Sequence, residues 1–507
     1  MATQSGRNVV FVVLDTVRKD HLSVYGYDRP TSPNLERFAE DAAVFDEAVA
    51  PAPWTLPVHA SLFTGQYPSQ HGASQENPYL KGSTTLAETL SEAGYATACY
   101  SANAWITPYT GLTRGFDEKD NFFKVMPGDL FSGPMASVWQ LLNDTGPLRS
   151  VADWLVNVGN EIHERLSASG DGDTKTPAII DRTIEFIDDA DEPYFAFVNL
   201  LDAHLPYHPP AEQRDQFAPG VDSTAVCQNS KEYNSGARDI DDDEWDDIRD
   251  LYDAEIRHVD EQLGRLLDYL RETDDWDDTL VVVAADHGEL HGENGLYGHE
   301  FAVYDPLVNV PLLVKHPELP ADRYDSQVEL IDLYHTVLDH ARVDPTRSHD
   351  AVTLNTARSL LSQHYREFAD GDLGAIGDGE YAFVEYFQPI VELNQLEHKA
   401  KAAGRTIDED SRFYSRMRVA RRPDAKYIQN ERIPDEAYRL DEDPGEQENL
   451  ANTGDPAFEE LQVALDEFTE RVTDGDRRMD ATAPDAGGLD DMDTQAKDRL
   501  RELGYLD

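Results

Sequence analysis

The sequence predicts an α/β fold in which helices flank a large, mostly parallel central sheet. Three runs of apolar, largely β-branched or aromatic residues predict strands that are buried on both faces of that sheet. These runs are residues 9–14, 194–200 and 280–285. Segments with helical periodicity lie between them, at residues 33–42, 85–93, 179–188 and 245–273. Strands that alternate with helices are typical of a sheet covered on both faces.

The last third of the chain lacks this alternation and predicts a small antiparallel sheet. Its short segments with strand character are residues 381–387, 417–420, 426–429 and 437–440. We therefore expect a large α/β domain over residues 1–345 and a C-terminal subdomain over residues 346–472. Loop-rich insertions are expected at 120–175 and 211–243, and residues 473–507 predict an acidic linker followed by a C-terminal helix.

Charge and cysteine content exclude several kinds of partner and site. The chain of 507 residues has a net charge of −56, from 99 acidic and 43 basic residues. Such a surface repels itself at low salt and is screened by molar salt, so we expect a halophilic source. It also repels nucleic acid and anionic lipid, which excludes both as partners. Two cysteines, Cys99 and Cys227, are too few for a disulfide framework or a cysteine metal site.

Location and assembly follow less directly from the sequence. The first residues are polar, and the chain contains no apolar run long enough to span a membrane. We therefore expect a soluble, cytoplasmic protein that is not attached to a membrane. The sequence does not decide the oligomeric state.

Acidic and imidazole side chains follow two of the predicted strands. Asp15 comes directly after the first strand, and Asp286 and His287 follow the third. The carboxyl ends of parallel strands meet at one edge of a sheet, so these side chains can converge on a divalent cation. Each residue alone is as easily a helix cap or a structural group. Their joint occurrence, with Gly298-His299 shortly after, favours a functional site.

A motif near residue 60 carries a family resemblance. The stretch Pro53-Trp54-Thr55-Leu56-Pro57-Val58-His59-Ala60-Ser61-Leu62-Phe63-Thr64-Gly65 resembles the sulfatase nucleophile motif C/S-x-P-x-R-x-S-x-x-T-G. Residues 14–27, 252–267 and 438–450 resemble other sulfatase segments in the right order. The chain thus resembles the sulfatase branch of the alkaline phosphatase superfamily over nearly its whole length. This resemblance implies an alkaline-phosphatase-like α/β sandwich and a sulfuric ester hydrolase.

The resemblance departs from the family at the residue that should react. Sulfatases oxidise a Cys or Ser to formylglycine, and Thr55, which stands at that position, cannot be converted in this way. An Asp/Thr/Asp/His set is similar to the single-metal site of lipoteichoic-acid synthases and phosphoethanolamine transferases, whose nucleophile is Thr. The likeness implies one divalent metal ion held by Asp15, Thr55, Asp286 and His287. An imidazole ligand favours Mn²⁺ or Zn²⁺, while Mg²⁺ and Ca²⁺ are compatible with the oxygen ligands.

The resemblance also implies roles for four other residues. His204 matches a family histidine near the leaving group, which indicates a general acid, and His299 matches a position that faces the substrate oxyanion. The Lys-x-His pair usual before the element Gly115-Phe116-Asp117 is absent, and Asn103 is the expected replacement contact to substrate. His59 replaces the arginine of the nucleophile motif, where it either contacts the substrate or packs in the core.

Three functions are compatible with these residues and with the family resemblance. The first is a metal-dependent hydrolase that cleaves a sulfate or phosphate ester by attack of Thr55. The second is a phosphotransferase or phosphodiesterase with a phospho-Thr intermediate. The third is a catalytically silent protein that binds anionic glycans, although such a protein need not keep Asp15, Asp286 and His287 together. Family resemblance favours sulfate, whereas Thr55 and His287 favour a phospho-ester. The expected substrate is a small sulfated or phosphorylated molecule, with glycans among the candidates.

Overall fold

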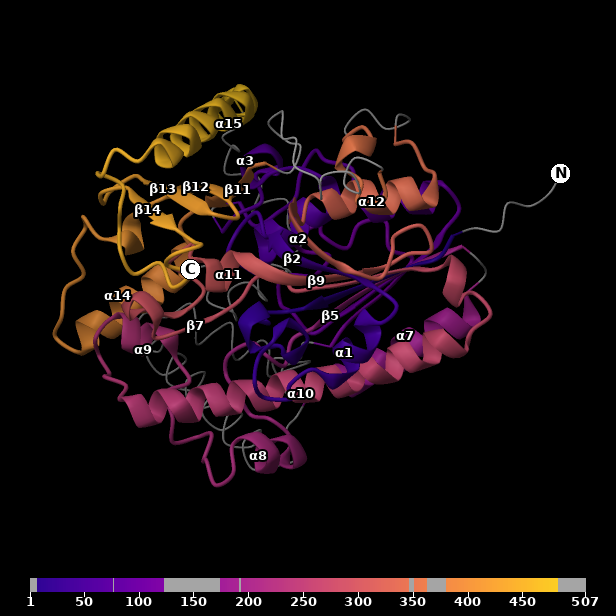
Figure 1. Cartoon of the computed structure of the whole chain (residues 1–507), viewed down its shortest axis with the longest axis horizontal. Helices are drawn as coiled ribbons and strands as arrows, with labels where there is room; N and C mark the ends of the chain where they lie inside the picture. Colours follow the sequence, from indigo (N-terminus) through magenta and orange to yellow (C-terminus); the bar gives the residue numbers. More distant parts are fainter. Residues whose placement is uncertain are drawn as a thin grey trace, which may run out of the picture.

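One central sheet organises the molecule. The computed structural model describes residues 7–75, 77–122, 174–190, 193–345, 351–362 and 380–481. Eight strands form this sheet in the order β10-β2-β9-β6-β1-β5-β3-β4 (Figure 1). They are β1 Val9–Leu14, β2 Ala43–Val49, β3 Ala96–Ser101, β4 Glu118–Asn121, β5 Tyr194–Leu200, β6 Leu280–Ala284, β9 Asn309–Lys315 and β10 Arg323–Glu329. Only β9 among these runs antiparallel to its neighbours, so the predicted, mostly parallel sheet is confirmed.

Strand β1 lies in the centre of the sheet because both of its faces are apolar. It pairs in parallel with β5, from Val9 opposite Phe195 to Leu14 opposite Leu200, and with β6 on its other side. Every residue of β1 is buried. A strand covered on both faces has no solvent side that would favour alternating polar residues. This explains why the three predicted apolar strands are continuous runs.

Helices cover both faces of the sheet, as the alternating pattern predicts. Helices α2 and α12, with α4 packed against them, lie on one face, and α1, α7 and α10 lie on the other (Figure 1). Their bounds are α1 Pro33–Ala39, α2 Thr55–Thr64, α4 Leu86–Glu92, α7 Thr176–Asp189, α10 Asp242–Glu272 and α12 Asp332–Ala341. The four predicted helices are therefore confirmed. Helix α10 begins three residues early because the Asp241 carboxylate accepts the Glu244 N–H and caps it.

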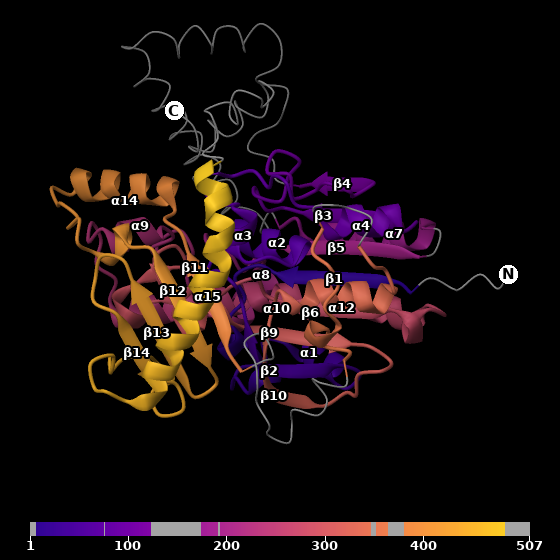
Figure 2. The same ribbon diagram turned by 90° about the horizontal axis from the view of Figure 1, so that it is seen from above.

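The C-terminal region forms the predicted antiparallel sheet, which lies beside one end of the central sheet (Figure 2). Its strands are β11 Ala382–Tyr386, β12 Met417–Arg422, β13 Ala425–Asn430 and β14 Glu436–Arg439, and its helices are α14 Ile390–Ala402 and α15 Pro456–Ala481. Buried Arg421 of β12 joins the two sheets, because its guanidinium donates to Glu47 of β2 at 2.6 Å and to Asp305 at 2.7 Å. Asp305 begins the short helix α11, Asp305–Val308.

Two boundaries differ from the prediction. Strand β4 continues to Asn121, so the first two residues of the expected insertion at 120–175 belong to the central sheet. Residues 123–173 of that insertion lie outside the described residues. Helix α15 continues to Ala481, so residues 473–481 are helical rather than linker. Its buried face anchors it on the small sheet as far as Val472, and the backbone stays helical to Ala481. The rest of the predicted linker and C-terminal helix lies outside the described residues.

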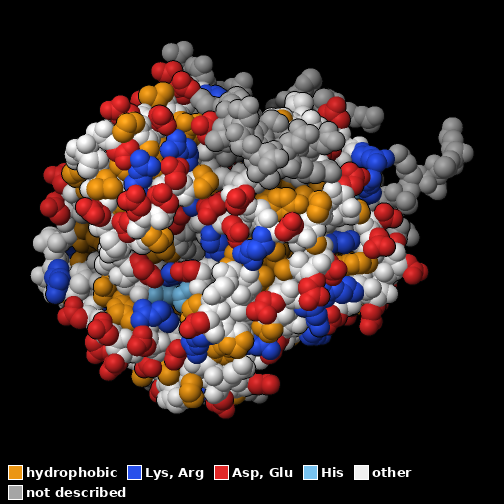
Figure 3. Space-filling model, in the orientation of Figure 1, with side chains coloured by type: hydrophobic (Ala, Val, Ile, Leu, Met, Phe, Trp, Pro, Cys, Tyr) orange, Lys and Arg blue, Asp and Glu red, His pale blue; other side chains and the backbone are white. Residues whose placement is uncertain are grey.

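The insertion at 211–243 carries three short or partial helices. They are α8 Ala211–Phe217, α9 Ser230–Asn234 and the first residues of α10. A further short helix among the described residues of the α/β region is α3, Pro68–His71. Within the described ranges, no helix combines the length and apolar character that crossing a bilayer requires. Acidic side chains are spread over the face shown in Figure 3 rather than gathered in one patch.

Candidate functional site

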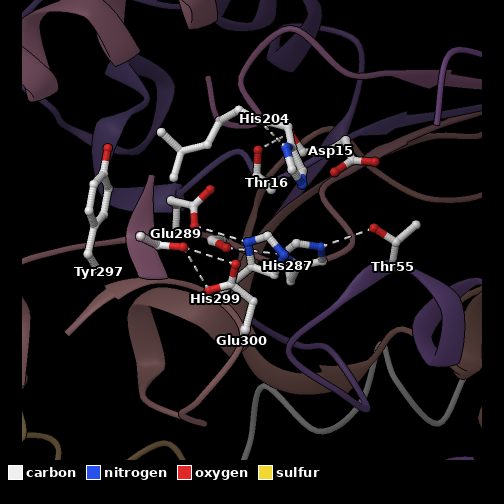
Figure 4. A network of polar contacts seen from close by, with 12 residues as sticks. Asp15, Thr16, Thr55, His204, His287, Glu289, Tyr297, His299 and Glu300 are labelled. Atoms are coloured by element: carbon white, nitrogen blue, oxygen red, sulfur yellow. Dashed lines mark hydrogen bonds and ion pairs between the residues drawn. The ribbon is translucent and has the colours of Figure 1, made fainter. Parts of the chain in front are cut away.

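The site is built at the carboxyl end of the central strands. Asp15 follows β1, Asp286 and His287 follow β6, and the three offer ligand atoms that all lie within 4.8 Å of one another. All three side chains are fully buried. Thr55, the first residue of α2, faces the same point, with its Oγ1 3.4 Å from His287 Nε2 (Figure 4). The structure therefore brings together all four residues of the predicted metal and nucleophile set.

Each of the two carboxylates has one oxygen held by the protein and one without a hydrogen-bond partner among the described residues. Asp15 Oδ2 accepts from Asn103 at 2.7 Å and from Asn199 at 3.1 Å. Asp286 Oδ1 accepts the backbone N–H of His287 at 3.0 Å and that of Thr16 at 3.3 Å. Asp15 Oδ1 and Asp286 Oδ2 are buried and unsatisfied. Buried oxygens are rarely left in this state, and a divalent cation would satisfy both.

Burial sets the protonation of the site in the absence of a cation. It raises the pKa of Asp15, with a further contribution from the nearby Asp286, and raises the pKa of Asp286 to about 7. It lowers the pKa of His287 to about 3, so the imidazole is neutral at physiological pH. Burial without a nearby positive charge disfavours the charged form of all three side chains, and a bound cation would favour ionisation of both carboxylates.

His287 presents its Nε2 lone pair to the site. Its Nδ1 lies 3.0 Å from the carbonyl oxygen of Gly288, which can only accept a hydrogen bond. Nδ1 therefore carries the hydrogen in the neutral ring, and Nε2 is left free to accept from the Thr55 hydroxyl or to bind a metal.

Asn103 holds the nucleophile and a ligand at the same time. Its Oδ1 accepts the Trp105 N–H at 2.8 Å, which assigns the amide orientation. The amide nitrogen then donates to Asp15 Oδ2 and, at 3.3 Å, to Thr55 Oγ1. Both amide hydrogens of this buried side chain are thus used within the protein. The contact of Asn103 to substrate stays a prediction, and the sequence did not show that the loop after β3 aims this side chain at Asp15 and Thr55.

His59 supports Thr55 from inside the core. Its side chain is fully buried, and Nδ1 lies 2.9 Å from the carbonyl oxygen of Thr55, one helical turn earlier. The ring packs edge-on against Phe63 and Phe197. Burial lowers the pKa of His59 to about 3, so it brings no positive charge. These contacts favour the packing alternative for His59 over the predicted contact to substrate.

Helix α2 explains the rest of the nucleophile motif. Trp54 is its N-cap and Thr55 its first residue, so the threonine side chain is free of any capping bond. The helix N-terminus favours negative charge at this point. Gly65 ends the helix at φ 67°, where a Cβ would lie 2.6 Å from the ring of Tyr334. The motif glycine is therefore needed both for the left-handed turn and for packing on α12.

His204 and His299 form the second side of the site (Figure 4). The ring centroid of His299 lies 4.5 Å from that of His287, and the centroid of His204 lies 5.2 Å from that of His299. His204 is half-buried on the loop after β5, with its Nδ1 2.6 Å from the Leu205 carbonyl oxygen. Both predicted histidines therefore lie beside the residues that the sequence predicts as metal ligands.

Two polar residues of the site were not predicted from the sequence. Asn199 holds Asp15 from β5, and Glu289 contacts His299, with its Oε1 3.0 Å from Nδ1. A signal for Asn199 was present, because an amide inside an apolar strand is a buried polar group that needs a partner. Glu289 gave no comparable signal, since its contact depends on the pairing of two very short strands.

Comparison with known proteins identifies the family. The sulfatase family profile matches residues 7–343. The multifunctional alkaline phosphatase superfamily protein PehA of Trinickia caryophylli is 26% identical over 93% of this chain and 96% of its own. Choline-sulfatase of Rhizobium meliloti (strain 1021) is 23% identical over 88% and 82%. The crystal structure of the phosphonate monoester hydrolase of Agrobacterium radiobacter shares the fold, with a TM-score of 0.64 at 22% identity over 93% and 96%. The chain belongs to the sulfatase family of ester hydrolases.

Proposed function

We propose that the protein is a divalent-metal-dependent hydrolase of sulfate or phosphate-type esters in which Thr55 is the nucleophile. One observation carries the proposal: Thr55 Oγ1 is fixed by Asn103 and His287 at the point where Asp15 and Asp286 each direct an unsatisfied oxygen. A threonine hydroxyl is a weak nucleophile unless a base or a metal activates it. This arrangement supplies both kinds of group beside one oxygen.

The donor set fits a divalent cation. Asp15, Asp286 and His287 would hold it, with Thr55 as a further ligand, and the neutral Nε2 of His287 favours Mn²⁺ or Zn²⁺. A cation bound there would lower the pKa of the Thr55 hydroxyl and offset the charge of both carboxylates. Mg²⁺ and Ca²⁺ are weaker candidates, because both prefer oxygen ligands to an imidazole nitrogen.

Charge limits the substrates that this site suits. Among the described residues, no lysine or arginine forms a hydrogen bond or ion pair with Asp15, Thr55, Asp286 or His287. A divalent cation balances the two carboxylates and leaves no excess positive charge. Sulfate monoesters, phosphodiesters and phosphonate monoesters each carry a single negative charge, and we expect them to be preferred over phosphate monoesters with two. Choline-sulfatase and the phosphonate monoester hydrolase are named for esters of this kind.

The side chains then divide the reaction between them. Thr55 gives its hydroxyl proton to water, and its Oγ1 forms a bond to sulfur or phosphorus as the bond to the ester oxygen breaks. The released oxygen takes a proton from the imidazolium form of His204, while His299 faces an oxygen of the ester. A water molecule then returns a proton to His204 and attacks the same sulfur or phosphorus, and the released Thr55 oxygen takes up a proton from water. Asn103 keeps Thr55 Oγ1 in place during both steps.

A substrate panel tests this function. Aryl sulfate, bis-aryl phosphate, an aryl phosphonate monoester and aryl phosphate are incubated with the protein in molar salt and Mn²⁺, because the net charge of −56 predicts a need for screening. We expect turnover of at least one singly charged ester, and its loss in Thr55→Ala even at a Mn²⁺ concentration that saturates the site formed by the three remaining ligands. A folded, metal-loaded protein that turns over none of the four esters would refute the proposal and favour an anion-binding role.

A further inference from the structure

A two-stranded hairpin places an acidic residue opposite His299. Strands β7, Leu290–His291, and β8, Tyr297–Gly298, are antiparallel, with Leu290 opposite Gly298. Glu289 directly precedes β7 and His299 directly follows β8, so the same register makes them the next cross-strand pair. The Oε1–Nδ1 distance of 3.0 Å follows from this pairing (Figure 4).

The hairpin is fixed to the loop that carries the first metal ligand. Arg18, three residues after Asp15, is buried; its Nη1 donates to the carbonyl oxygen of Glu289 at 3.1 Å and to Glu293 Oε1 at 2.6 Å. Gly288 donates its N–H to the Leu307 carbonyl at 2.9 Å. The chain between His287 and Glu289 passes so close to its neighbours that a Cβ on Gly288 would lie 2.0 Å from the Pro306 carbonyl oxygen.

Glu300, the acidic residue next to His299 in sequence, forms its side-chain hydrogen bonds with other residues. Glu300 forms an ion pair with Lys231 of α9 and accepts from Ser230 Oγ at 3.1 Å. Glu289 is fully buried, and its Oε2 has no hydrogen-bond partner among the described residues. Glu289 is therefore the acidic side chain that holds His299.

We propose that Glu289 is a positioning residue that fixes the ring of His299 through Nδ1 and leaves Nε2 facing the substrate. A histidine ring has a broad, nearly two-fold torsion at χ2, so without a contact at Nδ1 the ring can turn over and place Cδ2 where Nδ1 was and Cε1 where Nε2 was. A hydrogen bond from a buried carboxyl group selects one of these orientations, as such partners do for other functional histidines. The inference rests on the proposed function, because it assigns a second residue to the same reaction.

Four variants assayed with the preferred ester test this role: Glu289→Gln, Glu289→Leu, His299→Ala and the double variant Glu289→Leu/His299→Ala. The Gln amide can still contact Nδ1 by accepting or donating, so we expect Glu289→Gln to stay within about threefold of wild type. Glu289→Leu removes the contact, and we expect kcat to fall about 10- to 100-fold with KM little changed. In the His299→Ala background, the same Leu substitution is expected to cost nothing further.

Controls separate positioning from damage to the fold. Glu300→Gln is the matched control, because it changes the neighbouring buried carboxylate, whose hydrogen bonds go to Lys231 and Ser230 and, among the described residues, not to His299; it should keep kcat within about threefold. Thermal melting and bound metal are measured for every variant, and Glu289→Ala replaces Glu289→Leu if the latter does not melt cooperatively. The inference is overturned if Glu289→Leu keeps wild-type kcat, if Glu289→Gln loses as much as Glu289→Leu, or if Glu289→Leu costs the same with and without His299.

Different kinetic results would overturn the positioning role of Glu289 and the proposed function. If only the inference fails, Thr55→Ala is inactive while Glu289→Leu turns over normally. If the proposed function fails, Thr55→Ala keeps turnover or no ester of the panel is cleaved, and the role of Glu289 falls with it.

Discussion

The two sides of the site are built on different kinds of structure. Asp15, Asp286 and His287 follow strands in the middle of the sheet and Thr55 opens a buried helix, so each is held by backbone that the core fixes. His299, in contrast, is on a hairpin and depends on a contact to Glu289. Groups on sheet and helix ends are positioned by packing, whereas groups on loops need dedicated partners. We therefore expect substitutions on the first side to act through the metal and those on the second through orientation.

The largest effect is expected at a metal ligand on the strand side. Asp286→Asn removes a negative ligand with little change in volume, and we expect turnover to fall on the order of 10³-fold, corresponding to several kcal/mol of lost stabilisation. Bound metal per chain, measured by elemental analysis after dialysis, should fall in parallel. Full metal content in a folded Asp286→Asn protein would show that the ligand assignment is wrong.

The next effect separates two asparagines that hold the same carboxylate. Asn103 donates to both Asp15 and Thr55, whereas Asn199 donates to Asp15 but not to Thr55. Asn103→Ala should lower kcat up to about 100-fold, while Asn199→Leu should mainly weaken metal binding. Measuring kcat at saturating Mn²⁺ distinguishes them. Equal losses of kcat under that condition would mean that the contact of Asn103 to Thr55 contributes nothing.

A smaller effect is expected where the two sides are joined. Arg18 reaches from the loop after β1 to the hairpin, and Arg18→Met keeps most of its length while removing its donors. We expect a loss of about tenfold in kcat, with metal affinity preserved, because the hairpin rather than the ligand set is released. A calorimetric Mn²⁺ titration beside the kinetics tests this division. Weaker metal binding at unchanged kcat would reverse it.

The smallest effect is a pH dependence of metal affinity. Burial raises the pKa of Asp286 from 3.8 to about 7 in the metal-free protein, so below that pH a proton competes with the cation for the carboxylate. His287, with a pKa near 3, does not compete in this window. The Mn²⁺ affinity should thus be about fivefold weaker at pH 6 than at pH 7 and level off above neutrality. An affinity that stays constant between these two pH values would argue against Asp286 as the ligand that titrates.

The same pKa shift predicts the sign of a stability change. A carboxyl group whose pKa is raised on folding keeps its proton in the folded state after the unfolded chain has lost it. Its contribution therefore destabilises the metal-free protein as pH rises from about 4 to about 7. Cation binding removes this penalty. Thermal melting with and without Mn²⁺ tests this: the metal-induced rise in melting temperature should be larger at pH 7 than at pH 5.

The sequence was informative wherever a strand determined the geometry. Apolar runs predicted β1, β5 and β6, and the polar residues after β1 and β6 then had to meet. It was less informative about orientation. The residues around Asn103 do not show that the Trp105 N–H orients the Asn103 side-chain amide. Strands of two residues leave no periodic pattern from which the pairing of Glu289 with His299 could be predicted. The sequence predicted a linker from residue 473, whereas the backbone of α15 stays helical to Ala481.

In the proposed reaction, Thr55 itself forms the covalent bond to substrate. Its most direct test is rapid acid quenching of the wild-type protein during turnover, followed by mass spectrometry of the peptide that contains Thr55. We expect Thr55 to be unmodified before substrate is added and to carry one sulfo or phospho group during turnover. Turnover that leaves Thr55 unmodified while the same group appears on another residue, or formylglycine at position 55, would contradict it.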